Sequence, residues 1–363
     1  MTDRRPVLVV GAGIIGCAIA RELASRGVPC TVAEDRGVAG GATQASAGML
    51  APYVEAHERG PLLDLGVRSL RLFPEWIAAV RREARMDVEV AAIGTLEVAT
   101  THQRADALRA ASRDHGEWLD ADALRRACPE IANGHGARLI TEHGYAAAPQ
   151  LANALAQAAE GIGASFHAGR VVRVSRVDDG FRIETTNGVL EAARVVLAAG
   201  AWTNAVEGVR TPPIRPVRGQ IVRLGWPAQP LASIVWGPRC YVVPRLDHSV
   251  LVGATAEDAG FDERTTAAGV RDLLDAVCEL LPVAQDASFL DARAGLRPAA
   301  PDDLPVIGAD PDEPGVFHAS GHYRNGVLLA PITATLIADL IADDRRDPAL
   351  ADFSVTRFRT QRA

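Results

Sequence analysis

The sequence predicts a mixed α/β (α+β) fold in which one part has a parallel sheet and the other an antiparallel sheet. Three observations support this prediction. Residues 7–16 read VLVVGAGIIG, a short apolar run that leads into closely spaced glycines. A second apolar run, residues 28–33, follows after a stretch of helical length. From residue 214 to 296, runs such as GQIVRL, RCYVVPR and SVLVGAT alternate apolar and polar residues, which is typical of antiparallel strands.

The first glycine cluster has the spacing of a nucleotide-binding turn. Gly11, Gly13 and Gly16 fit G-x-G-x-x-G: the first allows a tight turn, the second admits a pyrophosphate, and the third lets a helix pack on the strand. A helix over residues 14–26 would direct its N-terminal N–H groups and dipole at the phosphates. Glu34, about 20 residues further on, is placed to accept hydrogen bonds from ribose hydroxyls. These features predict a Rossmann-like unit and leave both NAD and FAD open.

Composition excludes several classes of protein. A chain of 363 residues is long for one core and favours two domains. The net charge of −7 argues against nucleic acid or an anionic membrane as partner. Five cysteines without C-x-x-C spacing indicate a reducing compartment, and nine histidines without metal-ligand spacing predict no metal site. The apolar runs are too short for a signal peptide or a membrane span, so we expect a cytoplasmic protein.

A segment rich in small residues follows the second apolar run. Residues 40–52 read GGATQASAGMLAP, so the backbone there could approach a flat ligand closely and donate hydrogen bonds to it. A flexible surface loop is the alternative. The apolar ending at Met49 and Leu50 favours a buried segment.

The glycine turn with Glu34, the stretch ATQASAGM (42–49) and the C-terminal GHYRNGVLLAP (321–331) together resemble the D-amino-acid oxidase (DAO) family of FAD-dependent oxidoreductases, and within it the glycine oxidase branch. The likeness extends over nearly the whole chain and implies FAD rather than NAD. It also implies domains that are discontinuous in sequence. The FAD-binding domain would comprise residues 1–80, 150–210 and 300–363, and an antiparallel substrate-binding domain would comprise residues 81–149 and 211–299.

The resemblance implies cofactor contacts in four segments. They are Gly11, Gly13, Ile14, Ile15, Gly16, Glu34 and Asp35 near the N-terminus, Ala42, Thr43, Ala47, Gly48 and Met49 in the small-residue segment, Val171 and Gly200 in two later apolar runs, and His322, Tyr323, Arg324, Asn325, Gly326, Val327 and Leu328 near the C-terminus. For Val171 and Gly200, ordinary sheet core is the alternative. A last helix over residues 327–342 would direct its positive end at the flavin, with Pro331 tolerated only in its first turn. Because residues 295–330 contain no cysteine, we expect the FAD to be bound non-covalently.

The resemblance also implies a substrate site. Arg297 in GLRP would form a two-pronged salt bridge with the substrate carboxylate, which the planar guanidinium fork suits. Tyr241 would donate to the same carboxylate, and Arg324 and Met49 would lie close to the substrate. From sequence alone, both arginines could instead extend into solvent, and Tyr241 could be a core residue. Arg239 stands where relatives often have histidine and could favour a second acidic group.

These residues imply the oxidative deamination of glycine, sarcosine or small D-amino acids by hydride transfer to flavin, which gives an imine or keto acid, ammonia and H2O2. No catalytic acid or base is assigned, because positioning does most of the work. A role in thiamine biosynthesis and a homo-oligomer, a tetramer in the family, are further expectations. The alternatives are a dehydrogenase that uses an acceptor other than O2, such as a D-amino-acid dehydrogenase or a hydrogen-cyanide-synthase-like subunit, and a non-catalytic flavin-binding relative.

Overall fold

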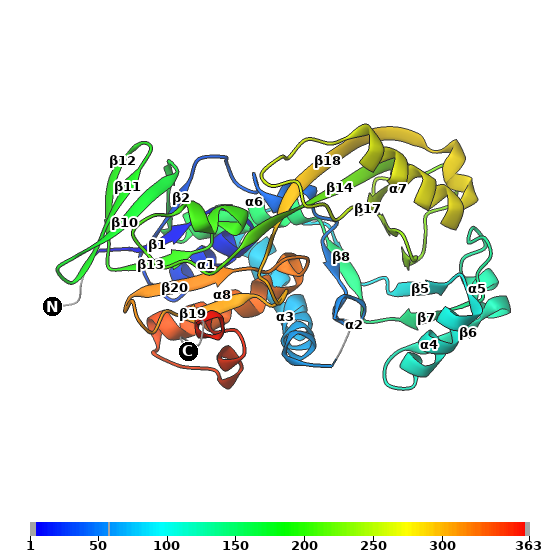
Figure 1. Ribbon diagram of the computed structural model, residues 1–363, viewed down its shortest axis with the longest axis horizontal. Coiled ribbons are helices and arrows are strands. Elements are labelled where there is room, and N and C mark those ends of the chain that lie inside the picture. The colour runs from blue at the N-terminus through cyan, green and yellow to red at the C-terminus, as the bar shows by residue number, and fades with distance from the viewer. Residues whose placement is uncertain (1–4, 57–58, 360–363) are drawn as a thin grey trace.

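The structure is a computed structural model that describes residues 5–56 and 59–359. Figure 1 shows two parts side by side. The parallel sheet around β1 and its covering helices form the left part, and the long strands β14 and β18 lead into a larger sheet on the right. The predicted mixed α/β class is confirmed: one large sheet is mainly parallel and the other mainly antiparallel.

The first sheet has six strands in the order β19, β20, β13, β1, β2, β9. Their bounds are β1 (Val7–Val10), β2 (Cys30–Glu34), β9 (Ser165–Ala168), β13 (Arg194–Leu197), β19 (Val306–Ala309) and β20 (Val316–Ser320). All neighbouring pairs are parallel except β19 with β20. β2 begins within the second apolar run of the sequence, and it ends at Glu34.

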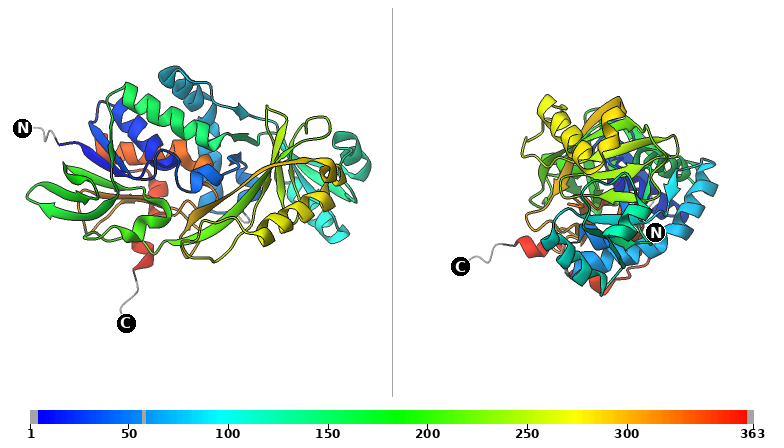
Figure 2. Two further views of the ribbon diagram at one scale, coloured as in Figure 1. Left: turned by 90° about the horizontal axis from the view of Figure 1, so that it is seen from above. Right: turned by 90° about the vertical axis from the view of Figure 1, so that its right-hand side faces the viewer.

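Both faces of β1 are covered, which explains its uninterrupted apolar sequence. Val7 and Val9 pack against a layer of helices, and Leu8 and Val10 pack against a small antiparallel sheet on the other face. The helices are α1 (Ile14–Ser25), α3 (Pro61–Ala84), α6 (Ala148–Gly161) and α8 (Gly326–Ala342). The small sheet comprises β10 (Val171–Val177), β11 (Gly180–Thr185) and β12 (Gly188–Ala192), seen at the left end in Figure 2.

The second large sheet has eight strands in the order β18, β14, β17, β16, β15, β5, β7, β6. Their bounds are β5 (Thr95–Ala99), β6 (Glu117–Asp120), β7 (Gly136–Ile140), β14 (Arg215–Gly225), β15 (Ile234–Trp236), β16 (Tyr241–Pro244), β17 (Ser249–Gly253) and β18 (Ser288–Ala299). Only the pair β15 with β5 is parallel among these strands. The helices α4 (His102–Ser112), α5 (Ala121–Ala127) and α7 (Ala267–Leu280) belong to this part.

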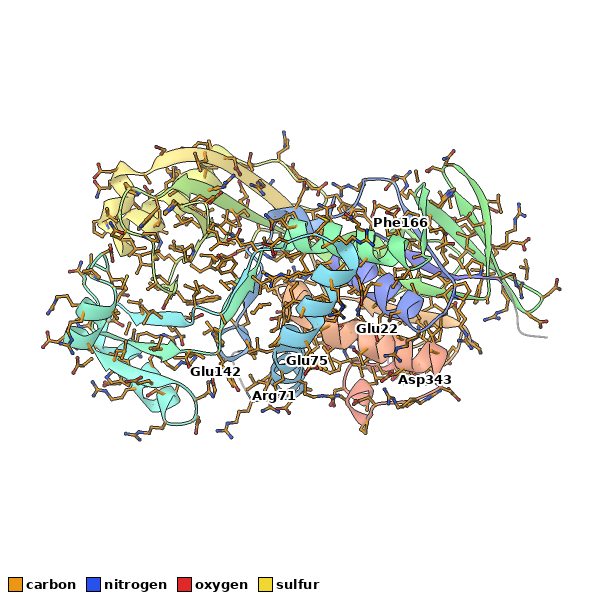
Figure 3. All side chains as sticks on the ribbon, turned by 180° about the vertical axis from the view of Figure 1, so that it is seen from behind. Glu22, Arg71, Glu75, Glu142, Phe166 and Asp343 are labelled. Atoms are coloured by element: carbon orange, nitrogen blue, oxygen red, sulfur yellow. The ribbon has the colours of Figure 1, made fainter. Side chains whose placement is uncertain are left out.

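A short sheet joins the two parts. It consists of β3 (Met49–Leu50), β8 (Gly144–Ala146) and β4 (Val90–Ala91), and α2 (Pro52–Glu55) follows β3 directly. Arg71 on α3 and Glu142 line a hollow beside this sheet, and Figure 3 shows both side chains at the junction of the two parts. Short 3-10 helices span Ala42–Ala45, Gly200–Ala205, Pro282–Asp286, Pro348–Ala351 and Val355–Phe358.

We expected Pro331 to be tolerated only in the first turn of the last helix, and it lies beyond that turn. α8 begins at Gly326, so Pro331 is its sixth residue. The buried Ser69 of α3 accommodates the proline, since its hydroxyl donates to the Leu328 carbonyl at 2.6 Å and lies 3.4 Å from the Ile332 amide. A neighbouring side chain thus satisfies the backbone groups that the proline disturbs.

The division into domains at residues 80, 150, 210 and 300 stays a prediction. The strands of the six-stranded sheet fall in the three segments assigned to one domain, and those of the eight-stranded sheet fall in the other two. None of the helices in residues 5–56 and 59–359 is long and apolar enough to cross a membrane.

Candidate active site

A large cleft opens at the carboxyl ends of β1, β2, β13 and β20, which is where open α/β sheets bind their ligands. It encloses about 1650 Å³ of space, its mouth included. Segments from the beginning, the middle and the end of the chain line this cleft. It continues past the parallel sheet to residues of β16 and β18 in the eight-stranded sheet. One cleft therefore joins the two parts of the molecule.

The glycine turn has the geometry that its spacing predicts. Gly11 has a φ of +102°, and a Cβ atom on Gly16 would lie 1.9 Å from the Gly11 carbonyl oxygen, so neither position accepts a side chain without a shift. A Cβ atom on Gly13 would meet only the Thr43 hydroxyl oxygen, at 3.6 Å, and this residue faces the cleft. Gly13 brings no capping side chain of its own, and the Thr43 hydroxyl accepts from the Ile14 amide at 3.1 Å. The first turn of α1 lines the cleft, where a pyrophosphate would lie.

The Glu34 carboxylate is held by backbone amides at the edge of the cleft. It accepts hydrogen bonds from Ala12 N at 2.9 Å, Asp35 N at 3.0 Å and Arg36 N at 2.7 Å. A carboxylate has about four acceptor sites, so it keeps capacity for a ribose hydroxyl. The fixed orientation of this carboxylate fits the role that the sequence predicted.

Three side chains near Glu34 were missed from the sequence. The Arg36 guanidinium lies 4.2 Å from the centroid of the Trp202 ring and pairs with Glu263 at 2.6 Å. Arg36 and Trp202 both line the cleft. They come from distant segments, and no local pattern connects them.

The small-residue segment packs tightly, which excludes the flexible surface loop. A Cβ atom on Gly48 would lie 1.7 Å from the Ala146 carbonyl oxygen, and one on Gly295 would lie 2.9 Å from Ala45. Arg245 donates from Nη2 to the Ala47 carbonyl oxygen at 2.8 Å. All five predicted contacts of this segment, Ala42, Thr43, Ala47, Gly48 and Met49, line the cleft, and so do Ala45 and Ser46.

The C-terminal loop closes the cleft from the opposite side. Burial lowers the pKa of His322 to about 3, so the ring stays neutral and its Nε2 pairs with the Thr333 hydroxyl at 3.0 Å. His322, Tyr323, Arg324, Gly326 and Val327 line the cleft, together with Ile14, Ile15, Asp35, Val171 and Gly200 from elsewhere. The predicted contacts Gly16, Asn325 and Leu328 do not line it. Gly16 packs on the turn and Leu328 belongs to the helical core, so both support the cleft from behind.

Two glycines make room for the side chains at the far end of the cleft. The Arg297 guanidinium lies across Gly219, where a Cβ atom would be 2.1 Å from its Nη1. The Tyr241 ring lies across Gly253, where a Cβ atom would be 2.4 Å from the hydroxyl oxygen. Burial raises the pKa of Tyr241, and Arg297 hydrogen-bonds to its side chain. Tyr241 therefore remains a protonated donor next to a permanent cation.

Arg324 lies near this pair and is partly neutralised. Its Nε lies 2.8 Å from Oε2 of Glu55, a buried carboxylate at the end of α2, and its guanidinium lies 5.7 Å from the Trp236 ring centroid. Glu55 also lines the cleft and was missed from the sequence, because a single acid in an ordinary helical turn carries no signal. Arg297, Tyr241, Arg324 and Met49 thus all line one cleft, as predicted for the substrate site.

The substrate-binding role predicted for Arg239 finds no support. Its guanidinium pairs with Glu279 of α7 at 2.7 Å, the side chain is about half exposed, and it does not line the cleft. The prediction rested on the family resemblance, since relatives often have histidine at this position. β16 begins only at Tyr241, so Arg239 lies in the preceding turn, and its guanidinium is directed at Glu279.

One cleft brings together the glycine turn, Glu34 and the small-residue segment with the side chains of Arg297 and Tyr241. Together they define a dinucleotide-dependent enzyme that handles a small anionic substrate. The family model described as "FAD dependent oxidoreductase" (DAO) matches residues 6–340. The chain therefore belongs to the DAO family of FAD-dependent oxidoreductases.

Several similar proteins align with nearly the whole chain. The chain is 37% identical to a glycine oxidase from Geobacillus kaustophilus over 98% of both chains, and the crystal structure of a glycine oxidase from that organism superposes with a TM-score of 0.92 over 97% of this chain and 98% of that one. It is 36% identical to the bifunctional protein ThiO/ThiG of Nostoc sp. strain PCC 7120, covering 98% of this chain and 56% of that protein. A hydrogen cyanide synthase subunit, HcnC, from Pseudomonas aeruginosa is 29% identical over 98% of this chain and 97% of that one.

The cofactor is FAD, and the residues present fit it. Gly13, the start of α1 and the fixed Glu34 carboxylate would hold the pyrophosphate and ribose, and the segment 42–49 with the start of α8 would hold the flavin. Among the described residues that line the cleft there is no cysteine, and burial raises the pKa of all five thiols of the chain.

Proposed function

We propose that this enzyme oxidatively deaminates glycine and other small amino acids or amines, such as sarcosine and small D-amino acids. One observation carries the proposal. Arg297 and Tyr241 converge where the eight-stranded sheet lines the cleft, whereas Glu34 lies at the parallel sheet, so the flavin rather than the adenosine would lie beside them. The glycine oxidase similarity over the whole chain supports the same substrate class.

The chain's own residues bind and orient the substrate. Arg297 offers a planar pair of donors to the carboxylate and Tyr241 adds a hydroxyl, which together fix the α-carbon. No ionisable group is required as a base if the amine enters uncharged. Bound FAD would supply the hydride acceptor and the reduction of O2 to H2O2, and water would hydrolyse the resulting imine to the keto acid and the free amine, which are glyoxylate and ammonia from glycine and glyoxylate and methylamine from sarcosine.

The setting of the reaction is also proposed. Similarity to the ThiO/ThiG protein supports a role in thiamine biosynthesis. Free and unreactive thiols support a reducing compartment, the cytoplasm, and the resemblance supports non-covalent FAD and a homo-oligomer of tetramer type. Denaturation with release of FAD and sedimentation of the native enzyme test the last two points.

A dehydrogenase that passes electrons to another acceptor is the weaker candidate, since the hydrogen cyanide synthase subunit is the less similar relative. The test is anaerobic bleaching of the flavin spectrum with glycine, sarcosine, D-alanine, D-proline and a dicarboxylic amino acid, followed by admission of air. We expect glycine or sarcosine to bleach the flavin and air to restore it with stoichiometric H2O2. Bleaching by none of them contradicts the substrate class, and bleaching without peroxide favours the dehydrogenase.

A further inference from the structure

Behind Arg297 lies a hydrogen-bonded cluster that no substrate can contact directly. We call it the support cluster, and it consists of Arg218, Gln220, Thr255, Glu257 and Thr266. Arg218 and Gln220 lie on β14, Thr255 and Glu257 follow β17, and Thr266 caps the N-terminus of α7. None of the five lines the cleft. Three elements of the eight-stranded part therefore meet around the buried side chains of Arg218 and Gln220.

The cluster contacts Arg297 through a single backbone oxygen. Arg297 Nη1 donates to the Thr255 carbonyl oxygen at 2.9 Å. Thr255 itself is fixed by β14, because its amide donates to the Gln220 carbonyl oxygen at 3.3 Å and its hydroxyl oxygen accepts from Gln220 N at 2.9 Å. The direction of the carbonyl that meets Arg297 thus depends on the loop after β17 staying attached to β14.

Glu257 is the residue that attaches this loop. Its Oε1 accepts from the Thr255 hydroxyl and from Gln220 Nε2 at 2.7 Å, and its Oε2 accepts from Arg218 Nη2 at 2.5 Å and from Nε at 3.2 Å. Backbone hydrogen bonds of 2.9 Å in both directions pair residue 257 with Arg218. Although burial by itself would raise the pKa of Glu257, the hydrogen bonds from Thr255, Arg218 and Gln220 lower it, so the group is ionised at neutral pH.

A substrate-binding arginine needs such support. Its long side chain has many rotamers, and two-pronged recognition of a carboxylate requires one orientation of the guanidinium plane. Gly219 supplies only open space beneath that plane. Thr255 occupies one N–H of the guanidinium and Tyr241 another, and the remaining N–H groups are left for the carboxylate.

We propose that Glu257 is a positioning residue for substrate binding: through Thr255 it holds the guanidinium of Arg297 in the orientation that receives the substrate carboxylate. The inference rests on the proposed function, in which Arg297 is the carboxylate anchor. Glu257 touches neither substrate nor FAD, so its influence is confined to carboxylate binding.

The test compares two Glu→Gln variants in the FAD-loaded enzyme. Glu257→Gln loses the charge that joins the loop to Arg218, and Glu279→Gln, the matched control, breaks the exposed pair with Arg239. The probe is glycolate, which keeps the carboxylate of glycine but has no amine, and its binding is followed by the flavin absorption spectrum. We expect Glu257→Gln to raise the glycolate Kd and the glycine KM by about tenfold, the equivalent of one lost hydrogen bond to a charged group. The kcat and the FAD Kd should stay within about twofold, as should every parameter of Glu279→Gln.

Two further variants keep the result decisive. Thr255→Val replaces only the hydroxyl with a methyl group and should raise the glycolate Kd less than Glu257→Gln does. If one of the two variants fails to fold, the other still tests the proposal. In an Arg297→Ala background, Glu257→Gln should have no further effect on glycolate, because its route to the substrate is gone. If Arg297→Ala weakens glycolate binding but Glu257→Gln does not, or if the two effects add, the positioning role is wrong. If Arg297→Ala itself leaves glycolate binding intact, the proposed function fails instead.

Discussion

The two ends of the cleft are built in different ways. At the cofactor end, the parallel sheet presents backbone and small residues from continuous segments, namely the turn at 11–16 and the loop at 42–49. At the substrate end, long side chains arrive from separate elements: Arg297 from β18, Tyr241 from β16, Arg324 before α8 and Glu55 from α2. The geometry of the cofactor end therefore depends on positions that have no side chain. The geometry of the substrate end depends on how strands that are distant in sequence pack together.

The largest effect is expected at the substrate end. Arg297→Ala removes the charged partner of the carboxylate and should raise the glycine KM by roughly 30-fold to several thousand-fold, since truncating a hydrogen-bonded charge pair costs about 2–5 kcal/mol. Steady-state kinetics measure this change. Unaltered glycine kinetics would show that the anchor lies elsewhere.

Tyr241→Phe is the next largest change at the same end. It deletes the hydroxyl donor and keeps the ring over Gly253, so the fold is undisturbed. The loss of a hydrogen bond to a charged group predicts about 1.5–3 kcal/mol, or roughly 10- to 150-fold in KM. A variant with normal KM would assign Tyr241 to packing alone, which is the core role that the sequence left open.

At the cofactor end, two neighbouring glycines should respond differently. Gly13→Ala meets no protein atom closer than 3.6 Å and has an ordinary backbone conformation, so the melting temperature of the apoprotein should hold while FAD affinity falls by about tenfold. Gly16→Ala collides with the Gly11 carbonyl and should lower the melting temperature as well. FAD titration with differential scanning fluorimetry separates the two outcomes. A Gly13→Ala protein with full FAD affinity would argue against a pyrophosphate at this turn.

The smallest effect concerns pH and two buried histidines, His322 beside the cleft and His143 between β7 and β8. Burial lowers the pKa of His322 and of His143 to about 3 each. A folded-state pKa below the unfolded value of about 6.5 means that stability is present above pH 6.5 and is lost as the pH falls from there toward 3. Each histidine should contribute about 1.4 kcal/mol to the loss between pH 7.5 and 5.5. Urea unfolding of His322→Gln and His143→Gln should show a smaller loss than wild type, and an identical loss in all three would refute the assignment.

The same contrast explains what the sequence could predict. The spacing of Gly11, Gly13, Gly16 and Glu34 encodes its own geometry, so strand, helix and acid could be placed without a structure. Arg297 and Tyr241 were found through family resemblance, since neither has a local pattern that separates it from a core or surface residue. Arg239 was also proposed from the resemblance, and its pairing with Glu279, away from the cleft, has no signal in the sequence.

Other residues could not be predicted at all. Glu55 and Trp202 lie in ordinary local sequence, and only tertiary packing brings them to the cleft. Glu257 belongs with Arg297 through a hydrogen-bond route that crosses three elements. A proline in the interior of α8 was not expected, and it is accommodated because Ser69 of α3 hydrogen-bonds to the backbone groups beside it.

The central claim is that one cleft has two separable ends, one for FAD and one for the substrate carboxylate. Side-by-side equilibrium titrations of the Arg297→Ala protein with FAD and, once loaded, with glycolate test it most directly. We expect the Arg297→Ala protein to have an FAD Kd within about twofold of wild type and to show no spectral response to glycolate at concentrations that saturate the wild-type enzyme. Retained glycolate binding, or loss of FAD together with glycolate, would contradict it.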